Sequence, residues 1–223
     1  MEAEVILKPV EKSRSLKEIA YDEIKKIIIS GKMNSKTLYS ANHFAGLLEI
    51  SRTPVREAIL QLAAEGFLIS QNGKGFQIKI PSKKEIQDFF ETRKILEIFL
   101  IQNFAETMNA KDLDYLQIEI DIMKKYSKLD DASGFISSDK NFHAYFIKKA
   151  DNQFLANMME SMQELITIFG IKNIQHIERK EDVIKEHQKI LDALKKNDVN
   201  MAINALKEHL DKTKLLLLSQ HEG

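Results

Sequence analysis

The sequence predicts a mainly α-helical protein, with short helices and a small sheet in its N-terminal third followed by an antiparallel all-α helical bundle. Apolar residues recur at three- and four-residue intervals along most of the 223 residues, which is the period of a helix. An alternation typical of a strand occurs near residues 76–80. Because the chain is longer than a typical small domain, we expect two domains, 1–80 and 81–223, with the boundary at Pro81.

Three helices are expected in the first domain. The first begins at the capping box formed by Ser15 and Glu18 and ends at Gly31. A short second helix spans 41–48, and a two-residue connection leads to a third helix that begins at Ser51. This spacing is typical of a helix-turn-helix.

The third helix has the properties of a DNA recognition helix. Its apolar positions share one face, whereas Arg52 and Arg56, four residues apart, share another. Ser51 or Thr53 can cap the helix. A guanidinium group can bond guanine O6 and N7 together, or a phosphate. The same pattern also fits an ordinary amphipathic helix with solvated arginines. The apolar positions are Val55, Ala58, Ile59 and Leu62.

Two strands with a tight turn follow the third helix. Leu68 and Ile69 precede the turn Asn72-Gly73-Lys74-Gly75, and the alternating run 76–80 follows it. Small residues at the tip allow close approach to a DNA groove, and Lys74 supplies a positive charge for phosphate. Three helices and a hairpin make a winged helix-turn-helix.

Residues from about 15 to 80 resemble the winged helix of the GntR superfamily of bacterial transcription regulators. The signature Ser-Arg-Thr-Pro-Val-Arg-Glu-Ala of that superfamily occurs unchanged at 51–58. The resemblance implies that bases are read by the arginines and threonine of this run, with help from the wing tip and a residue near phosphate in the second helix. Ala41 departs from the pattern, because an acidic residue usually opens that helix. The expected DNA-binding residues are Asn42, Ser51, Arg52, Thr53, Arg56, Asn72, Gly73 and Lys74.

The composition is compatible with DNA binding but does not by itself indicate it. The formal net charge is zero, with 33 basic and 33 acidic residues, so the motif rather than the charge points to nucleic acid. The chain contains no cysteine, which excludes disulfides and thiolate metal sites and is consistent with a cytoplasmic protein. Apolar runs such as 215–218 are too short to span a membrane.

The second domain is expected to be helical throughout. The capping box of Ser82 and Glu85 opens it, and short polar breaks separate the helices, which predicts an antiparallel bundle. The expected helices lie near 83–107, 111–129, 132–150, 153–176, 180–196 and 198–219.

Four polar residues occupy positions where the helical pattern calls for apolar ones. Asp139 and His143 lie one turn apart on the inward stripe of the third bundle helix, and His187 and His209 fall on the inward stripes of the last two. One carboxylate and three imidazoles suit a divalent transition metal such as zinc, nickel, manganese, iron or cobalt, with zinc or nickel the first choices. Alternatively, each histidine is a hydrogen-bonded core residue and Asp139 forms an ion pair with one of them.

Residues from about 83 to 220 resemble the FCD ligand-binding domain of the FadR-like branch of the superfamily, and the count of six helices resembles its VanR-like version. The matching elements include Arg93 with Glu97, the Asp139 and His143 pair, Glu186 followed by a histidine, and a late histidine. The resemblance implies that the Asp and three His residues hold a metal. It also implies that Arg93 helps to hold a small carboxylate effector, although Arg93 could equally pair with Glu97.

Together these observations predict a homodimeric transcription regulator that binds an imperfect palindrome in operator DNA. Repression relieved by a small organic acid is the usual outcome for such proteins, although the sequence does not determine whether this protein represses or activates transcription. A metal sensor, in which the ion itself is the signal, is the alternative. An enzyme is not expected, because Glu186 should point away from the site and leave it without a general base.

Overall fold

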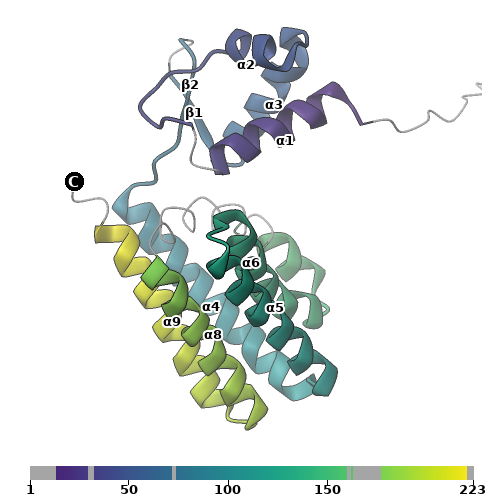
Figure 1. The fold of residues 1–223 in the computed structure, drawn as a ribbon, viewed down its shortest axis with the longest axis vertical. Coiled ribbons are helices and arrows are strands. Elements are labelled where there is room, and N and C mark those ends of the chain that lie inside the picture. Colours follow the sequence, from purple (N-terminus) through teal and green to yellow (C-terminus); the bar gives the residue numbers. More distant parts are fainter. Residues whose placement is uncertain (1–13, 30–32, 72–73, 160–161, 163–176, 220–223) are drawn as a thin grey trace, which may run out of the picture.

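The computed structural model describes residues 14–29, 33–71, 74–159, 162 and 177–219. The described residues are mainly helical, and the described sheet has two short strands, which confirms the predicted fold class. Figure 1 colours the elements by their place in the sequence and shows the small sheet beside the first three helices. Among the described residues, no helix combines the length and apolar character needed to cross a membrane.

The first three helices and the hairpin form the predicted winged helix-turn-helix. Strands β1 and β2 are antiparallel, with Leu68 opposite Ile78. The apolar sides of the three helices share one core that includes Ile24, Phe44 and Ile59. The elements are α1 (Leu16–Ile29), α2 (Ala41–Leu48), α3 (Arg52–Ala64), β1 (Leu68–Ser70) and β2 (Phe76–Ile78).

Local hydrogen bonds explain where these helices begin. The capping box at Ser15 is formed, with the backbone of Glu18 donating to the Ser15 hydroxyl over 3.2 Å. The Ser40 hydroxyl accepts from the backbone of His43 over 3.1 Å, so α2 is capped despite the absence of an acidic residue. Of the two residues expected to cap α3, Ser51 rather than Thr53 occupies the N-cap position, but its side chain makes no cap hydrogen bond.

The wing gains a third short segment that the sequence pattern did not reveal. The backbone of Tyr39 exchanges two hydrogen bonds with Phe76, of 2.8 and 2.7 Å. Gly75 has a φ of 151°, and a Cβ at this position would lie 2.8 Å from the Tyr39 carbonyl oxygen. A residue without a side chain is therefore needed where the wing passes Tyr39.

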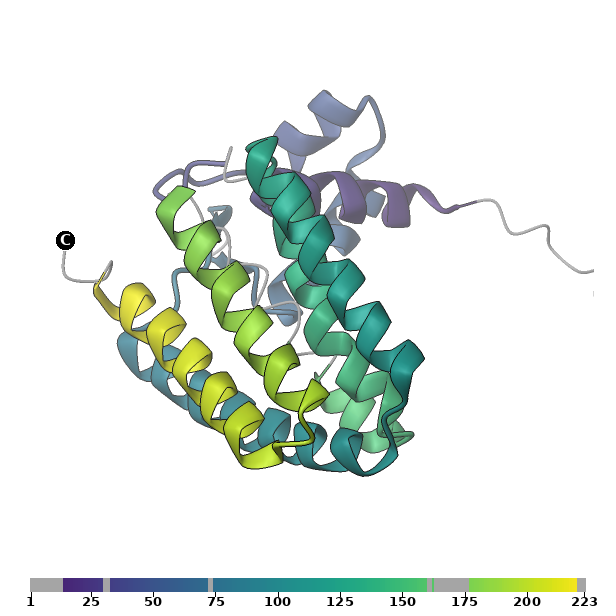
Figure 2. The same cartoon turned by 60° about the horizontal axis from the view of Figure 1, so that its bottom comes forward.

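The second group of helices surrounds its own apolar core. Among the described residues, the main packing contacts join the helices in the order α4, α9, α8, α5, α6 and back to α4, and Figure 2 shows α8 between α9 and α5. The capping box predicted at Ser82 opens the first of these helices. The helices are α4 (Lys83–Thr107), α5 (Ala110–Lys128), α6 (Ala132–Lys149), α8 (Ile177–Lys195) and α9 (Val199–Ser219).

The observed bounds agree with five of the expected bundle helices to within about three residues. Of the expected helix 153–176, residues 153–159 are helical, and most of the remainder lies outside the described residues. The count of six helices therefore stays a prediction. The two cores have no residue in common, and the proposed boundary at Pro81 falls between β2 and α4.

Candidate metal centre and DNA-binding surface

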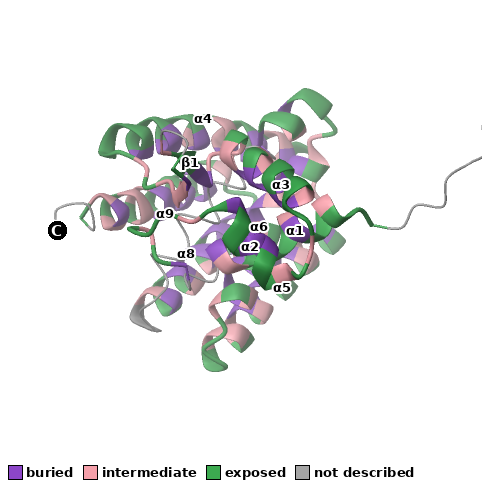
Figure 3. Ribbon diagram, turned by 90° about the horizontal axis from the view of Figure 1, so that it is seen from above, coloured by how far each residue is buried: buried purple, intermediate pink, exposed green. Residues whose placement is uncertain are grey.

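The recognition helix α3 buries its apolar side and presents its signature residues outward. Val55 and Ile59 are fully buried, whereas Arg52, Thr53 and Arg56 are exposed. Figure 3 shows this exposed side of α3 in green. Neither arginine has an ion-pair partner in the described part of the chain, so both guanidinium groups are available to an external acceptor.

The structure describes some, but not all, of the other residues expected to contact DNA. Asn42, in the first turn of α2, Ser51 and Lys74 are exposed. Asn72 and Gly73, at the wing tip, lie outside the described residues. The role of all these residues in DNA binding stays a prediction.

The four polar residues expected in the bundle core come together in one cluster. Asp139 and His143 extend from α6, His187 from α8 and His209 from α9, and one ligand atom from each lies within 4.8 Å of the others. The His187 Nε2 atom is 3.2 Å from both His143 Nε2 and Asp139 Oδ1. The imidazoles are buried, and the Asp139 side chain is 18% exposed. We refer to these residues as the Asp–His cluster.

Each imidazole of the cluster engages a partner through Nδ1. His143 Nδ1 is 2.7 Å from Glu97 Oε2, and His209 Nδ1 is 2.8 Å from Glu186 Oε2. His187 Nδ1 is 2.8 Å from the Val183 carbonyl oxygen. A carbonyl oxygen can only accept, so His187 Nδ1 carries a proton. Partners of this kind are typical of histidines that bind metal through the other ring nitrogen.

The donor atoms of the cluster fit a cation. With Nδ1 protonated, His187 Nε2 either carries a second proton that it donates to the Asp139 carboxylate or keeps a lone pair for a bound cation, so a positive charge lies between the two groups in both cases. Burial lowers the pKa of His209 to about 4, so this ring is neutral and able to coordinate at neutral pH. Burial raises the pKa of Asp139, but the hydrogen bond from His187 and the charges of His187, His143 and His209 together outweigh it and keep the pKa below its usual range. Three imidazole nitrogens and one carboxylate are a donor set suited to a divalent transition ion.

Arg93 forms the ion pair with Glu97 that was one of its two expected roles, and its contact with an effector stays a prediction. It is buried, and its Nε forms an ion pair with Glu97 Oε1. Its Nη2 atom is buried and has no hydrogen-bond partner in the described part of the chain. Burial raises the pKa of Glu97, but Arg93 and His143 together hold it at about 2. One guanidinium therefore neutralises Glu97 and still offers an unsatisfied donor, which is costly when buried.

The expectation that Glu186 points away from the cluster is wrong. It is buried and accepts from His209 rather than pointing away from the cluster. Arg179 also binds it through both terminal nitrogens, over 2.9 and 3.1 Å. Burial raises the pKa of Glu186, but the hydrogen bonds from His209 and Arg179 hold it at about 2. Glu186 lies behind His209 and is occupied by these partners, so it is poorly suited to act as a general base.

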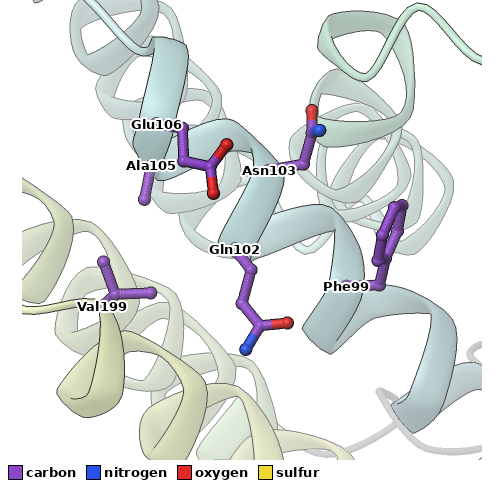
Figure 4. Close-up of a pocket in the computed structure, with 6 residues that line it drawn as sticks. All are labelled: Phe99, Gln102, Asn103, Ala105, Glu106 and Val199. Carbon is purple, nitrogen blue, oxygen red and sulfur yellow. The ribbon is translucent and has the colours of Figure 1, made fainter.

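A surface hollow of about 600 Å³ lies where α4 passes the start of α9. Figure 4 shows the side chains around it, and none of the residues expected at a site lines it. We assign it no role. The lining residues are Phe99, Gln102, Asn103, Ala105, Glu106 and Val199.

Comparison with protein families matches both halves of the chain. Residues 16–78 match the model described as bacterial regulatory proteins, gntR family. Residues 88–212, more than half of the chain, match the model of the FCD domain.

Individual relatives agree with these matches. The chain is 27% identical over 198 residues to the gluconate operon transcriptional repressor of Bacillus subtilis (strain 168), covering 86% of this chain and 81% of the repressor. The structure resembles that of McbR/YncC from E. coli, with a TM-score of 0.76, 20% identity and coverage of 94% and 100% of the two chains. It also resembles the metal-free FCD domain of the regulator TM0439, with a TM-score of 0.55, 23% identity and coverage of 63% and 96%.

Proposed function

The chain belongs to the GntR family of bacterial regulatory proteins and carries an FCD domain, and we propose that it is a repressor whose affinity for operator DNA depends on a small carboxylate bound at the Asp–His cluster. It is a DNA-binding transcription regulator, as its named relatives are. The observation that carries the proposal is the convergence of four ligand atoms within 4.8 Å, each imidazole being fixed from behind.

Operator recognition depends on α3 and the wing. Arg52 and Arg56 are exposed on one side of a helix whose other side is held by the core, so their guanidinium groups can reach base edges or phosphates in a major groove. In a homodimer, two such helices would enter successive major grooves about one helical turn apart. The operator is then an imperfect palindrome.

The Asp–His cluster would hold a divalent transition ion, which supplies a positive centre for the carboxylate of a small acid. The Nε2 atom of His187 lies 3.2 Å from His143 Nε2 and 3.2 Å from Asp139 Oδ1. Zinc and nickel suit these nitrogen and oxygen donors, and availability decides among the transition ions.

Arg93 supports an anionic effector in addition to the ion. Its buried Nη2 donor has no partner in the described residues, and a carboxylate would supply one. The pairing of its Nε with Glu97 keeps the guanidinium close to His143, because Glu97 contacts both residues. This donor favours an acid effector over a regulator in which the metal alone is the signal.

Binding at the cluster can reach the DNA-binding helices through α4. The cluster joins α6, α8 and α9, while Glu97 ties α4 to α6. Because α4 begins at Lys83, directly after the segment that leaves β2, a change in how these helices pack alters the position of the winged helix. Two packings with different operator affinity are what coupling between the sites requires.

Metal analysis and native mass spectrometry of the chain purified from its host test this function. We expect one divalent ion per chain, a dimer mass and a retained small acid. Full metal occupancy in a variant carrying both His187→Ala and His209→Ala would refute the site. A wild-type chain that binds the ion weakly and reversibly, with operator affinity independent of any acid, would instead indicate a metal sensor.

A further inference from the structure

Two of the three imidazoles in the Asp–His cluster are each held by a glutamate from a neighbouring helix. Glu97 of α4 accepts from His143 of α6 over 2.7 Å, and Glu186 of α8 accepts from His209 of α9 over 2.8 Å. All four side chains are at least 95% buried. Each of these hydrogen bonds therefore joins two helices inside the bundle, out of reach of solvent.

A carboxylate in this position decides which ring nitrogen carries the proton. An ionised carboxylate has no proton to donate, so Nδ1 of His143 and of His209 donates, and in the neutral ring Nε2 then has the lone pair. A metal ion takes that lone pair. His187 has a comparable arrangement through the Val183 carbonyl oxygen, which is a backbone acceptor that no side-chain substitution removes.

Each glutamate is in turn held by an arginine. Glu97 binds the imidazole through Oε2 and Arg93 through Oε1. Glu186 receives both terminal nitrogens of Arg179. A buried carboxylate needs such compensation, and the second contact also fixes the orientation of the carboxylate plane. Removing either glutamate leaves one imidazole free to rotate or to change tautomer.

We propose that Glu97 and Glu186 are positioning residues that keep His143 and His209 in the Nδ1–H form, with Nε2 directed into the Asp–His cluster. This inference rests on the proposed function and names the side chains that set the metal affinity of the site. Glu97 has an additional role, because α4 supplies none of the four cluster residues. In the described part of the chain, Glu97 is the residue of α4 that forms a hydrogen bond with the cluster.

Zinc affinity of the full-length chain, measured by competition with a chromophoric chelator, tests the positioning role. We expect Glu97→Ala and Glu186→Ala each to weaken zinc binding by about 10- to 100-fold. Glu97→Gln and Glu186→Gln should lose less, because an amide oxygen still accepts from Nδ1–H. Glu119→Ala is the matched control, since Glu119 is also buried but is bound by Asn141 and lies outside the cluster. Its zinc affinity should be unchanged.

Long-range proton–nitrogen NMR spectra of the metal-free chain report which ring nitrogen of each histidine carries the proton. A glutamate that only stabilised the fold would not change this tautomer. The wild-type spectra should show His143 and His209 protonated on Nδ1. Glu97→Ala should alter the tautomer of His143 alone, and Glu186→Ala that of His209 alone. Unchanged tautomers, or unchanged zinc affinity in both alanine variants, would overturn the inference. Failure of the wild type to bind zinc would contradict the proposed metal site, while the tautomer spectra would still decide the positioning role.

Discussion

His187→Ala should remove the stabilisation that zinc gives to the helical bundle. The His187 side chain is fully buried, and its Nε2 is 3.2 Å from both His143 Nε2 and Asp139 Oδ1, so the variant lacks the donor that lies between two others. At a zinc concentration of about one hundred times Kd, binding stabilises the wild type by roughly 2.7 kcal/mol. For a chain of this size this corresponds to a rise in Tm of about 5 to 11 °C.

The assay is thermal unfolding followed by circular dichroism, with and without zinc. If the substitution weakens zinc binding about 100-fold, the same concentration stabilises the variant by only roughly 0.4 kcal/mol, or about 1 to 2 °C. The metal-free variant will itself melt at a lower temperature, because the ring packs edge-on against Phe142 at 4.6 Å, so the zinc-induced shift within each protein is the quantity compared. His43→Ala, at an exposed histidine in α2, should keep the full shift. A wild-type shift in His187→Ala would refute the assignment of this residue.

Three further predictions concern the two domains. Arg56→Ala should weaken binding to the specific operator by about 1–3 kcal/mol, measured by fluorescence anisotropy, and an equal loss on random DNA would show that it contacts only phosphate. Arg93→Ala should weaken binding of the acid retained by the native protein without removing the metal, and unchanged affinity by calorimetry would exclude the proposed clamp. Gly134→Ala should destabilise the bundle by about 1–3 kcal/mol, because the added Cβ would lie 2.4 Å from the Tyr126 ring. Gly46→Ala has open space around the added Cβ and should stabilise α2 by about 0.5–1 kcal/mol. Equal melting shifts for the two glycine variants would contradict the packing argument.

Helical periodicity and capping residues predicted the fold because they act locally. The capping box at Ser82 marks the start of α4, and both hydrogen bonds of the box are formed. The bridge between Tyr39 and Phe76 could not be predicted, because a single paired residue leaves no alternating pattern. Ser51 shows a second limit. The residue type favoured an N-cap, but its side chain makes no cap hydrogen bond.

The cluster residues were predictable because each interrupts an apolar stripe at an inward position. Glu186 was expected to point away from the cluster because consecutive side chains of a helix point about 100° apart. Which neighbouring helix lies on that side of α8 cannot be predicted from the sequence of α8 alone. Since α9 packs against α8, that direction leads to His209. Arg93 shows a related limit, because the sequence could not reveal that one nitrogen of its guanidinium pairs with Glu97 while another has no partner among the described residues.

Operator affinity measured as a function of the state of the cluster tests the central claim most directly. The operator is first recovered by selection from host DNA, and its Kd is then measured for the wild type as purified, after removal of metal and bound acid, and after their return. We predict a change of about 5- to 150-fold between these states and no change in the variant carrying both His187→Ala and His209→Ala. The same Kd for the wild type in every state would contradict the account.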